Sequence, residues 1–403
     1  MKLCGIIAEY NPFHKGHKLQ LDSAKEKSGA DLCVVVMSGM FTQRGDMAIA
    51  SKFLRAQIAL TQGADIVIEL PVCYALQPAE YFALGGVGIL DGLGADFISY
   101  GTEAVTESQR AVIDEFVKLT DKPTRPFEKE IKANLSQGVS YPQARAEAFS
   151  KIAKITDISI LKSPNAILEI AYRNAINTLG SSIVPLPVPR AGDAYHESCP
   201  KSSIASATSI RNLIKENKDF SAFVPKACST LLNEYFSENI IPDINMLYPY
   251  IVHTAAAEPD KFKHLPDGSP ELYNRFINAV SKSKSYQELI GNVSTRRFTY
   301  ARVSRAAIHS ILNISDSFVY EMRRRLPLYA RVLAIKEEKK DFLGTLTKQS
   351  KIPVFTSAAK HPLKTNLQKK MFSYDMAATN LYNLTLKNVD LFNQDYTQKL
   401  TIC

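Results

Sequence analysis

The chain has 403 residues, of which 45% are hydrophobic and 22% charged, a composition that supplies a large core and excludes a wholly disordered protein. Lys and Arg number 49 against 40 Asp and Glu, and the resulting net charge of +9 permits a polyanionic partner without requiring one. The six cysteines form no CxxC pair, so we expect reduced thiols and no zinc or other protein-held metal. No uninterrupted apolar run suits a signal peptide or a membrane span, and we therefore expect a cytoplasmic protein with no membrane partner.

The first half alternates short apolar runs with helix-like segments. Strands are predicted over residues 3–8, 31–37, 65–70, 97–100 and 183–188, and helices over 15–27, 52–62, 78–93 and 206–216. This alternation predicts βαβ units and a parallel sheet. Residues 106–178 are mostly helical in pattern, with proline-containing breaks at 122–126 and 163–165, and we interpret them as helical insertions in the sheet domain.

From about residue 218 the strand signals fade. Helices are predicted over residues 272–280, 286–290, 302–312, 318–325 and 330–342. We therefore expect an α/β domain over residues 1–217 and a mostly α-helical domain over residues 218–403.

The sharpest chemical signal is the string His14-Lys15-Gly16-His17, which follows the first predicted strand and opens the first helix. A helix start offers free N–H groups and a positive dipole end, and Gly16 lets a nucleotide approach the backbone closely. Two imidazoles one turn apart can donate hydrogen bonds to a triphosphate and stabilise departing pyrophosphate. The alternative is that both histidines only cap the helix. The sequence contains neither a P-loop nor a dinucleotide-binding GxGxxG after a strand.

A second motif opens the helix after the last strand predicted in the first half. Ser206 and Thr208 place hydroxyls at the helix start, where they suit the β- and γ-phosphates, and Arg211 adds charge one turn later. By itself this pattern is also a simple capping motif.

Together, and in this order, the two motifs resemble the HxGH nucleotidyltransferase superfamily, which implies a Rossmann-like parallel sheet. More narrowly, the chain is similar to the bacterial tRNA(Met) cytidine acetate ligase family, chiefly over about residues 1–217. That resemblance is carried by GIIAEYNPFHKGH at 5–17, QRGD at 43–46, KFLRA at 52–56, GADIVIELP at 63–71, GTE at 101–103, SPNAIL at 163–168 and SATSIR at 206–211. Weaker matches are TRRFT at 295–299 and YARVL at 329–333.

The resemblance implies that acetate attacks the α-phosphate of ATP, and that the acetyl group of acetyl-adenylate passes to N4 of the wobble cytidine of elongator tRNA(Met). It implies catalytic roles for His14, His17 and Arg211. The ATP site would comprise Ile7, Ala8, Glu9, Asn11, Pro12, Phe13, His14, Gly16, His17, Gln20, Gly101, Asn165, Arg190, Ser206, Thr208 and Arg211. Mg²⁺ is expected with ATP, although no dedicated carboxylate cage is visible.

Arginines interleaved with aromatic residues suit RNA, through phosphate pairing and base stacking. The candidate tRNA-binding residues are Arg44, Arg296, Arg297, Arg302, Arg305, Arg323, Arg324 and Arg331. The alternative is that these arginines form solvated helix faces, with Arg44 in a solvated loop.

The roles of several other polar residues stay open. Lys52 and Arg55, at i and i+3, would contact phosphate or be simply solvated. Glu9 would be a polar site residue or a structural one, and Asn165 would be a helix N-cap or an ATP contact. Asp193 and His196 are further polar residues placed near the site.

The rival functions are an adenylyltransferase or acetate ligase acting on a small molecule or a protein, and a non-enzymatic RNA-binding protein. The rival enzymes share the ATP site but have no need of the arginine cluster. The sequence leaves the oligomeric state open.

Overall fold

The structure is a computed structural model that describes residues 1–190, 205–238, 241–325, 327–360, 363–386 and 391–403. Asp193 and His196, placed near the site above, lie outside the described residues. In the described part of the chain, no helix is both long and apolar enough to cross a membrane.

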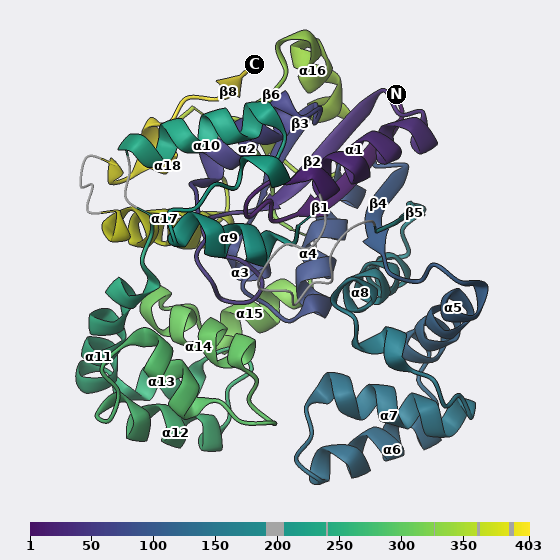
Figure 1. Cartoon of the computed structure of the whole chain (residues 1–403), viewed down its shortest axis with the longest axis vertical. Coiled ribbons are helices and arrows are strands. Elements are labelled where there is room, and N and C mark those ends of the chain that lie inside the picture. The colour runs from purple at the N-terminus through teal and green to yellow at the C-terminus, as the bar shows by residue number, and fades with distance from the viewer. Residues whose placement is uncertain (191–204, 239–240, 326, 361–362, 387–390) are drawn as a thin grey trace.

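One eight-stranded sheet forms the centre of the fold, in the order β5-β4-β1-β2-β3-β6-β7, with β8 paired to β6 (Figure 1). The strands are β1 (Leu3–Ala8), β2 (Leu32–Ser38), β3 (Ile66–Leu70), β4 (Phe97–Thr102), β5 (Val184–Pro189), β6 (Ala330–Ile335), β7 (Val354–Phe355) and β8 (Thr401–Ile402). Strands β1 to β5 are mutually parallel, which confirms the predicted βαβ organisation.

Helices cover both faces of this sheet. The helices of the first half are α1 (Lys15–Ser28), α2 (Lys52–Thr61), α3 (Val72–Ala75), α4 (Ala79–Gly92), α5 (Glu107–Asp121), α6 (Arg125–Ser136), α7 (Tyr141–Ala153), α8 (Pro164–Leu179) and α9 (Ala207–Lys215). Those of the second half are α10 (Lys226–Glu238), α11 (Tyr248–Ala257), α12 (Pro270–Val280), α13 (Tyr286–Val293), α14 (Tyr300–Leu312), α15 (Asp316–Arg323), α16 (Lys340–Gln349), α17 (Asn366–Thr385) and α18 (Gln394–Thr397).

Two groups of helices extend away from the sheet, as Figure 1 shows. The group α5 to α7 forms the first part of the insertion predicted over residues 106–178 and has its own small core around Phe116, Phe127 and Phe149. The group α11 to α14 belongs to the second half of the chain, and its apolar side chains join the main core.

The second half also contributes three strands, which the sequence did not indicate. β6 runs antiparallel to β3, and β7 and β8 pair along the other edge of β6. The helix predicted over residues 330–342 is therefore wrong for its first half: all six residues of β6 are buried, and a continuous apolar run of this length does not distinguish a strand from a buried helix. The sheet draws strands from both sides of the predicted boundary at residue 217.

The order of the strands indicates where a ligand is expected to bind along the sheet. β1 lies between β2 and β4. The chain first adds β2 and β3 on one side of β1, and then adds β4 and β5 on its other side. In open α/β sheets ligands bind at such a switch point, beside the carboxyl ends of the strands. The HxGH string begins six residues after β1 ends, at this edge.

Candidate active site

The two histidines of the HxGH string cap helix α1 and stack on each other. His14 is the N-cap residue, and its Nδ1 accepts the His17 N–H at 3.3 Å, while His17 Nδ1 accepts the His14 N–H at 3.2 Å. The ring centroids lie 3.6 Å apart with an 18° interplanar angle. Because each Nδ1 accepts a backbone hydrogen bond, each neutral ring carries its proton on Nε2 and donates from it. Capping and ligand binding therefore use different nitrogens of the same rings.

Both rings are neutral near pH 7. Burial, followed by the charges of Arg190 and Arg211, lowers the pKa of His14 to about 3. Burial also lowers the pKa of His17 well below its ordinary value, with the His14 ring and Arg190 acting in the same direction. The site thus combines two uncharged donors with two nearby guanidinium groups at a helix N-terminus, an arrangement suited to a polyanion.

The second motif lies directly against the first. Ser206 caps α9 by accepting the Ser209 N–H at 3.1 Å, which matches the predicted cap. Arg211 donates from Nη1 to the Asn11 carbonyl at 2.7 Å and from Nη2 to Thr208 Oγ1 at 3.1 Å. Segments 200 residues apart in sequence therefore meet at one place.

A third group of residues lies at the carboxyl end of β4. Glu103 Oε1 accepts a hydrogen bond from Asn165 Nδ2 and one from Arg190 Nη1, the latter at 3.4 Å. Gly101 packs against Arg190, since a Cβ at residue 101 would lie 3.4 Å from Arg190 Cγ. Ser163, and not Asn165, occupies the N-cap position of α8, so the N-cap interpretation of Asn165 is wrong.

The other predicted ATP-site residues form the turn between β1 and α1. Glu9 Oε1 accepts the Gln43 N–H at 2.7 Å, and Asn11 Oδ1 accepts the Ile49 N–H at 2.8 Å. Burial raises the pKa of Glu9, although the Gln43 N–H and Arg211 act in the opposite direction. These bonds shape the turn, and the remaining predicted residues lie along it or on its flanking elements: Ile7, Ala8, Pro12, Phe13, Gly16 and Gln20.

The predicted tRNA-binding arginines differ widely in exposure. Arg44, Arg296, Arg297 and Arg324 are exposed, and Arg302 and Arg323 are half-buried. Arg297 pairs with Glu271 at 2.7 Å, and Arg324 lies over the exposed ring of Tyr320. Asp267 pairs with Arg323 at 2.8 Å, and its carbonyl accepts a bond from Arg302.

Two of these arginines are buried, so their assignment to RNA binding is wrong. Arg305 is 7% exposed and donates to the Gln43 carbonyl at 3.1 Å. Gly45, at φ +80°, packs against the backbone of the same helix, where a Cβ would lie 2.6 Å from the Arg305 nitrogen. Arg331 is 4% exposed and forms ion pairs with Glu69 and Asp395.

Lys52 and Arg55 are also buried. Both predictions for them, a contact with phosphate and a solvated position on the surface, are therefore wrong. Lys52 is 0% exposed and pairs with Glu69 at 2.5 Å and Asp395 at 2.6 Å. Arg55 is 1% exposed and donates to backbone carbonyls, among them that of Glu9 at 2.6 Å. The carboxylate partners Glu69 and Asp395 come from distant segments. Glu69 carries a sequence signal, a charge within an apolar run, whereas Asp395 lies among polar residues and carries none.

Comparison with known proteins agrees with the fold and with the family resemblance. Residues 1–397 match the family described as HIGH Nucleotidyl Transferase. The tRNA(Met) cytidine acetate ligase of Thermoanaerobacter sp. (strain X514) is 35% identical over 99% of both chains, and that of Thermosipho africanus is 34% identical over 96% of both. The crystal structure of apo Thermotoga maritima TmcAL superimposes with a TM-score of 0.92, at 28% identity over 100% of this chain and 99% of that one. A second structure of TmcAL, bound with alpha-thio ATP, gives 0.90, at 27% identity and the same coverage. The chain belongs to the HIGH nucleotidyl transferase family and, within it, to the tRNA(Met) cytidine acetate ligases.

Proposed function

We propose that this protein is an ATP-dependent ligase that makes acetyl-adenylate from acetate and ATP and acetylates N4 of the wobble cytidine of elongator tRNA(Met). The observation that carries the proposal is the neutral, stacked pair of His14 and His17, with Arg190 and Arg211 beside it, at the start of α1. The names of the relatives and the ATP analogue bound to the structural neighbour support it.

The histidine pair binds the triphosphate in this proposal. Each ring donates a hydrogen bond from its Nε2–H group to a phosphate oxygen. Because both rings are neutral near pH 7, this donation does not depend on protonation of the imidazole. Arg211, together with the Ser206 and Thr208 hydroxyls, holds the distal phosphates at the start of α9. Preorganised donors of this kind stabilise the charge that develops on the leaving pyrophosphate.

Asn165 and Arg190 contribute from the other side of the switch point, beside Gly101. In this structure both contact Glu103, which fixes their side chains at the carboxyl end of β4. Glu9, Asn11, Phe13 and the residues between them hold the turn that faces the nucleotide. We assign them to shaping the site and not to the chemical step.

Mg²⁺ enters this site as the counterion of ATP. Among the described residues, no group of three or more His, Cys, Asp or Glu side chains is arranged to hold a metal ion. A protein cage for the ion therefore does not fit the residues that the structure describes. Mg²⁺ commonly keeps substrate phosphates and water as its ligands, and these would supply its coordination here.

The reaction has two steps. An acetate oxygen attacks the α-phosphorus of ATP, the bond to the β-phosphate oxygen breaks, and pyrophosphate leaves. The cytidine N4 lone pair then attacks the acetyl carbon, AMP leaves, and N4 loses a proton. Since the acyl phosphate is already activated, positioning of the two reactants supplies much of the second step.

The exposed arginines of the second half form the proposed tRNA contact. Arg296, Arg297 and Arg324 present guanidinium groups to solvent, with the rings of Tyr300 and Tyr320 exposed near them in sequence. Half-buried Arg302 and Arg323 add charge behind them, and Arg44 adds charge on the loop that packs against α14. Guanidinium groups beside exposed aromatic rings suit backbone pairing and base stacking.

The test has two arms. Acetate-dependent exchange of labelled pyrophosphate into ATP measures the first step, and its absence in the purified, folded protein would refute acetyl-adenylate formation. Mass spectrometry of nucleosides from bulk tRNA incubated with enzyme, ATP and labelled acetate measures the second. Exchange without labelled N4-acetylcytidine would assign the protein to a small-molecule or protein acceptor instead.

A further inference from the structure

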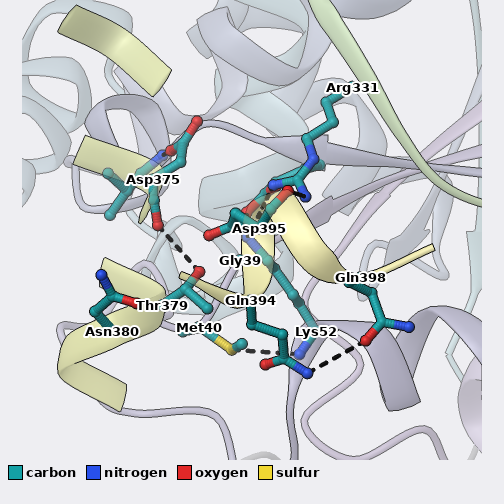
Figure 2. A network of polar contacts seen from close by, with 12 residues as sticks. Gly39, Met40, Lys52, Arg331, Asp375, Thr379, Asn380, Gln394, Asp395 and Gln398 are labelled. Atoms are coloured by element: carbon teal, nitrogen blue, oxygen red, sulfur yellow. Dashed lines mark hydrogen bonds and ion pairs between the residues drawn. The ribbon is translucent and has the colours of Figure 1, made fainter. Parts of the chain in front are cut away.

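Four buried charges connect the first half of the chain with its C-terminal segment. Lys52, at the start of α2, pairs with Glu69 of β3 at 2.5 Å and with Asp395 of α18 at 2.6 Å. Arg331 of β6 pairs with the same two carboxylates, with Glu69 at 2.9 Å. Figure 2 shows Asp395 on its short helix between the Lys52 and Arg331 side chains. We call these four residues the buried charge network.

The buried charge network is neutral and tightly matched. Each cation meets both carboxylates, and all four side chains are at most 5% exposed. Burial would raise the pKa of Asp395, but Lys52 and Arg331 outweigh it and lower the pKa to about 2. Buried charges are costly unless such geometry compensates them, so losing one member leaves an uncompensated charge.

The network touches the scaffold of the ATP site at the end of β2. Gly39 lies against Glu69, since a Cβ on Gly39 would be 2.8 Å from Glu69 Oε1. The backbone N–H of Lys52 donates to Met40 Sδ at 3.4 Å, a contact drawn in Figure 2. A side chain larger than glycine at residue 39, or a Glu69 in another rotamer, would therefore displace this turn.

Arg55 carries the connection from this turn to the HxGH string. Its Nη2 donates to the Gly39 carbonyl, and its Nη1 donates to the Ser38 carbonyl at 3.1 Å and the Glu9 carbonyl at 2.6 Å. Glu9 lies two residues before Asn11, whose carbonyl accepts the Arg211 guanidinium. Ion pairs, the packing of Glu69 on Gly39, the hydrogen bonds of Arg55 and the backbone from Glu9 to Asn11 thus connect the C-terminal segment with the proposed phosphate site.

We propose that Asp395 is a positioning residue for the ATP site: by holding Lys52 and Glu69 in place, the C-terminal helix α18 fixes the turn after β2 and, through Arg55, the start of the HxGH loop. This inference rests on the proposed ATP binding. Among the described residues, Asp395 and Glu69 are the carboxylates paired with Lys52 and Arg331, so without Asp395 two cations share Glu69. Glu69 then moves relative to Gly39, and the nucleotide loop moves with it.

The first experiment compares Asp395→Asn with a control that lowers stability elsewhere. Asp395→Asn keeps the shape of the side chain and removes its charge. Leu346→Ala removes a fully buried side chain on α16, which takes no part in the network. In acetate-dependent exchange, measured well below each variant's melting temperature, we expect Asp395→Asn to raise the KM for ATP at least about tenfold, because small misplacements of binding groups cost that much. Leu346→Ala should leave the KM within about twofold.

The second experiment uses the unmodified protein, so it holds even where Asp395→Asn fails to fold. Coupling between two sites is reciprocal, so saturating alpha-thio ATP should slow hydrogen–deuterium exchange of the amides of residues 394–398. The Tyr396 and Gln398 N–H groups, bonded to Asn393 and Gln394, are the amides to follow.

The outcomes separate the two proposals. Protein that binds no alpha-thio ATP overturns the proposed function and this inference together. Protein that binds it with unchanged exchange at residues 394–398 overturns the positioning role alone. Equal KM values for Asp395→Asn and Leu346→Ala also overturn that role, because they mean that the network only stabilises the fold.

Discussion

Replacing His309 by leucine should change how stability depends on pH. His309 lies on α14 and is 2% exposed. Among the described residues, neither of its ring nitrogens has a hydrogen-bond partner. The backbone of Leu76 lies close enough to raise the pKa of the ring slightly. Burial lowers its pKa to about 3, and the nearby Arg305 acts in the same direction. The other charged groups that act on the ring are Asp267, which opposes this shift, and Arg323.

The sign follows from proton counting. Between the unfolded pKa near 6.5 and the folded pKa near 3, the unfolded chain binds a proton at His309 that the folded protein does not. Stability from this residue is therefore lost as the pH falls, at about 1.4 kcal/mol per pH unit. From pH 7.5 to pH 4.5 the loss is about 2.7 kcal/mol, and His309→Leu removes it.

Urea unfolding at pH 7.5 and pH 4.5, followed by circular dichroism, measures the effect for the wild type and His309→Leu. The free energy of unfolding of the variant should improve relative to the wild type by about 2–3 kcal/mol on acidification. Because the comparison is made at each pH, contributions from every other titrating group cancel. A difference between the two proteins that is the same at both pH values would refute the reasoning.

Three further changes test the site and the surface. His14→Ala removes an Nε2 donor and the cap of α1, and should lower the rate of pyrophosphate exchange about 10²–10³-fold; a loss below tenfold would contradict the proposed role. The double variant Arg296→Glu, Arg297→Glu should abolish tRNA acetylation and leave exchange within about twofold, and loss of both activities would mean that these residues are misassigned. Arg331→Met leaves the two buried carboxylates sharing Lys52, with one negative charge uncompensated, and should lower the free energy of unfolding by about 3–5 kcal/mol in urea titrations. Filter binding below the unfolding transition should show unchanged tRNA affinity, and weaker binding with unchanged stability would return Arg331 to the RNA surface.

The first five strands could be predicted because each is a short apolar run followed by a helical pattern. Such runs are typical of strands buried by βαβ crossovers, as β1, β2 and β3 are. β6 has the same apolar character, but it follows a long series of helices and carries Arg331 within it. Its identity as a strand depends on pairing with β3, about 260 residues earlier, and local periodicity holds no information about such pairing. β7 and β8, with two paired residues each, are too short to leave a pattern.

Part of the site could also be predicted from local sequence patterns. The HxGH and Ser206–Arg211 motifs are contiguous in sequence, and helix starts have recognisable residues, so both elements could be placed. Glu103 was visible only as part of a family match, because its role depends on Asn165 and Arg190, which come from other elements. The division of labour between Nδ1 and Nε2 in the histidine pair is a matter of geometry that no residue pattern encodes.

The arginines show why a charge count overstates an RNA-binding surface. Arg55, Arg305 and Arg331 each add one unit to the net charge of +9, yet all three are buried, where backbone carbonyls or carboxylates satisfy them. An arginine used inside the fold is recognisable only by its partners, and these lie in distant segments. The charge available to a polyanion is therefore that of the exposed residues, above all Arg296 and Arg297. If these two carry the tRNA contact, their reversal separates acetylation from exchange. Loss of Arg331 should instead reduce stability and leave tRNA affinity unchanged, because its charge is already paired within the fold.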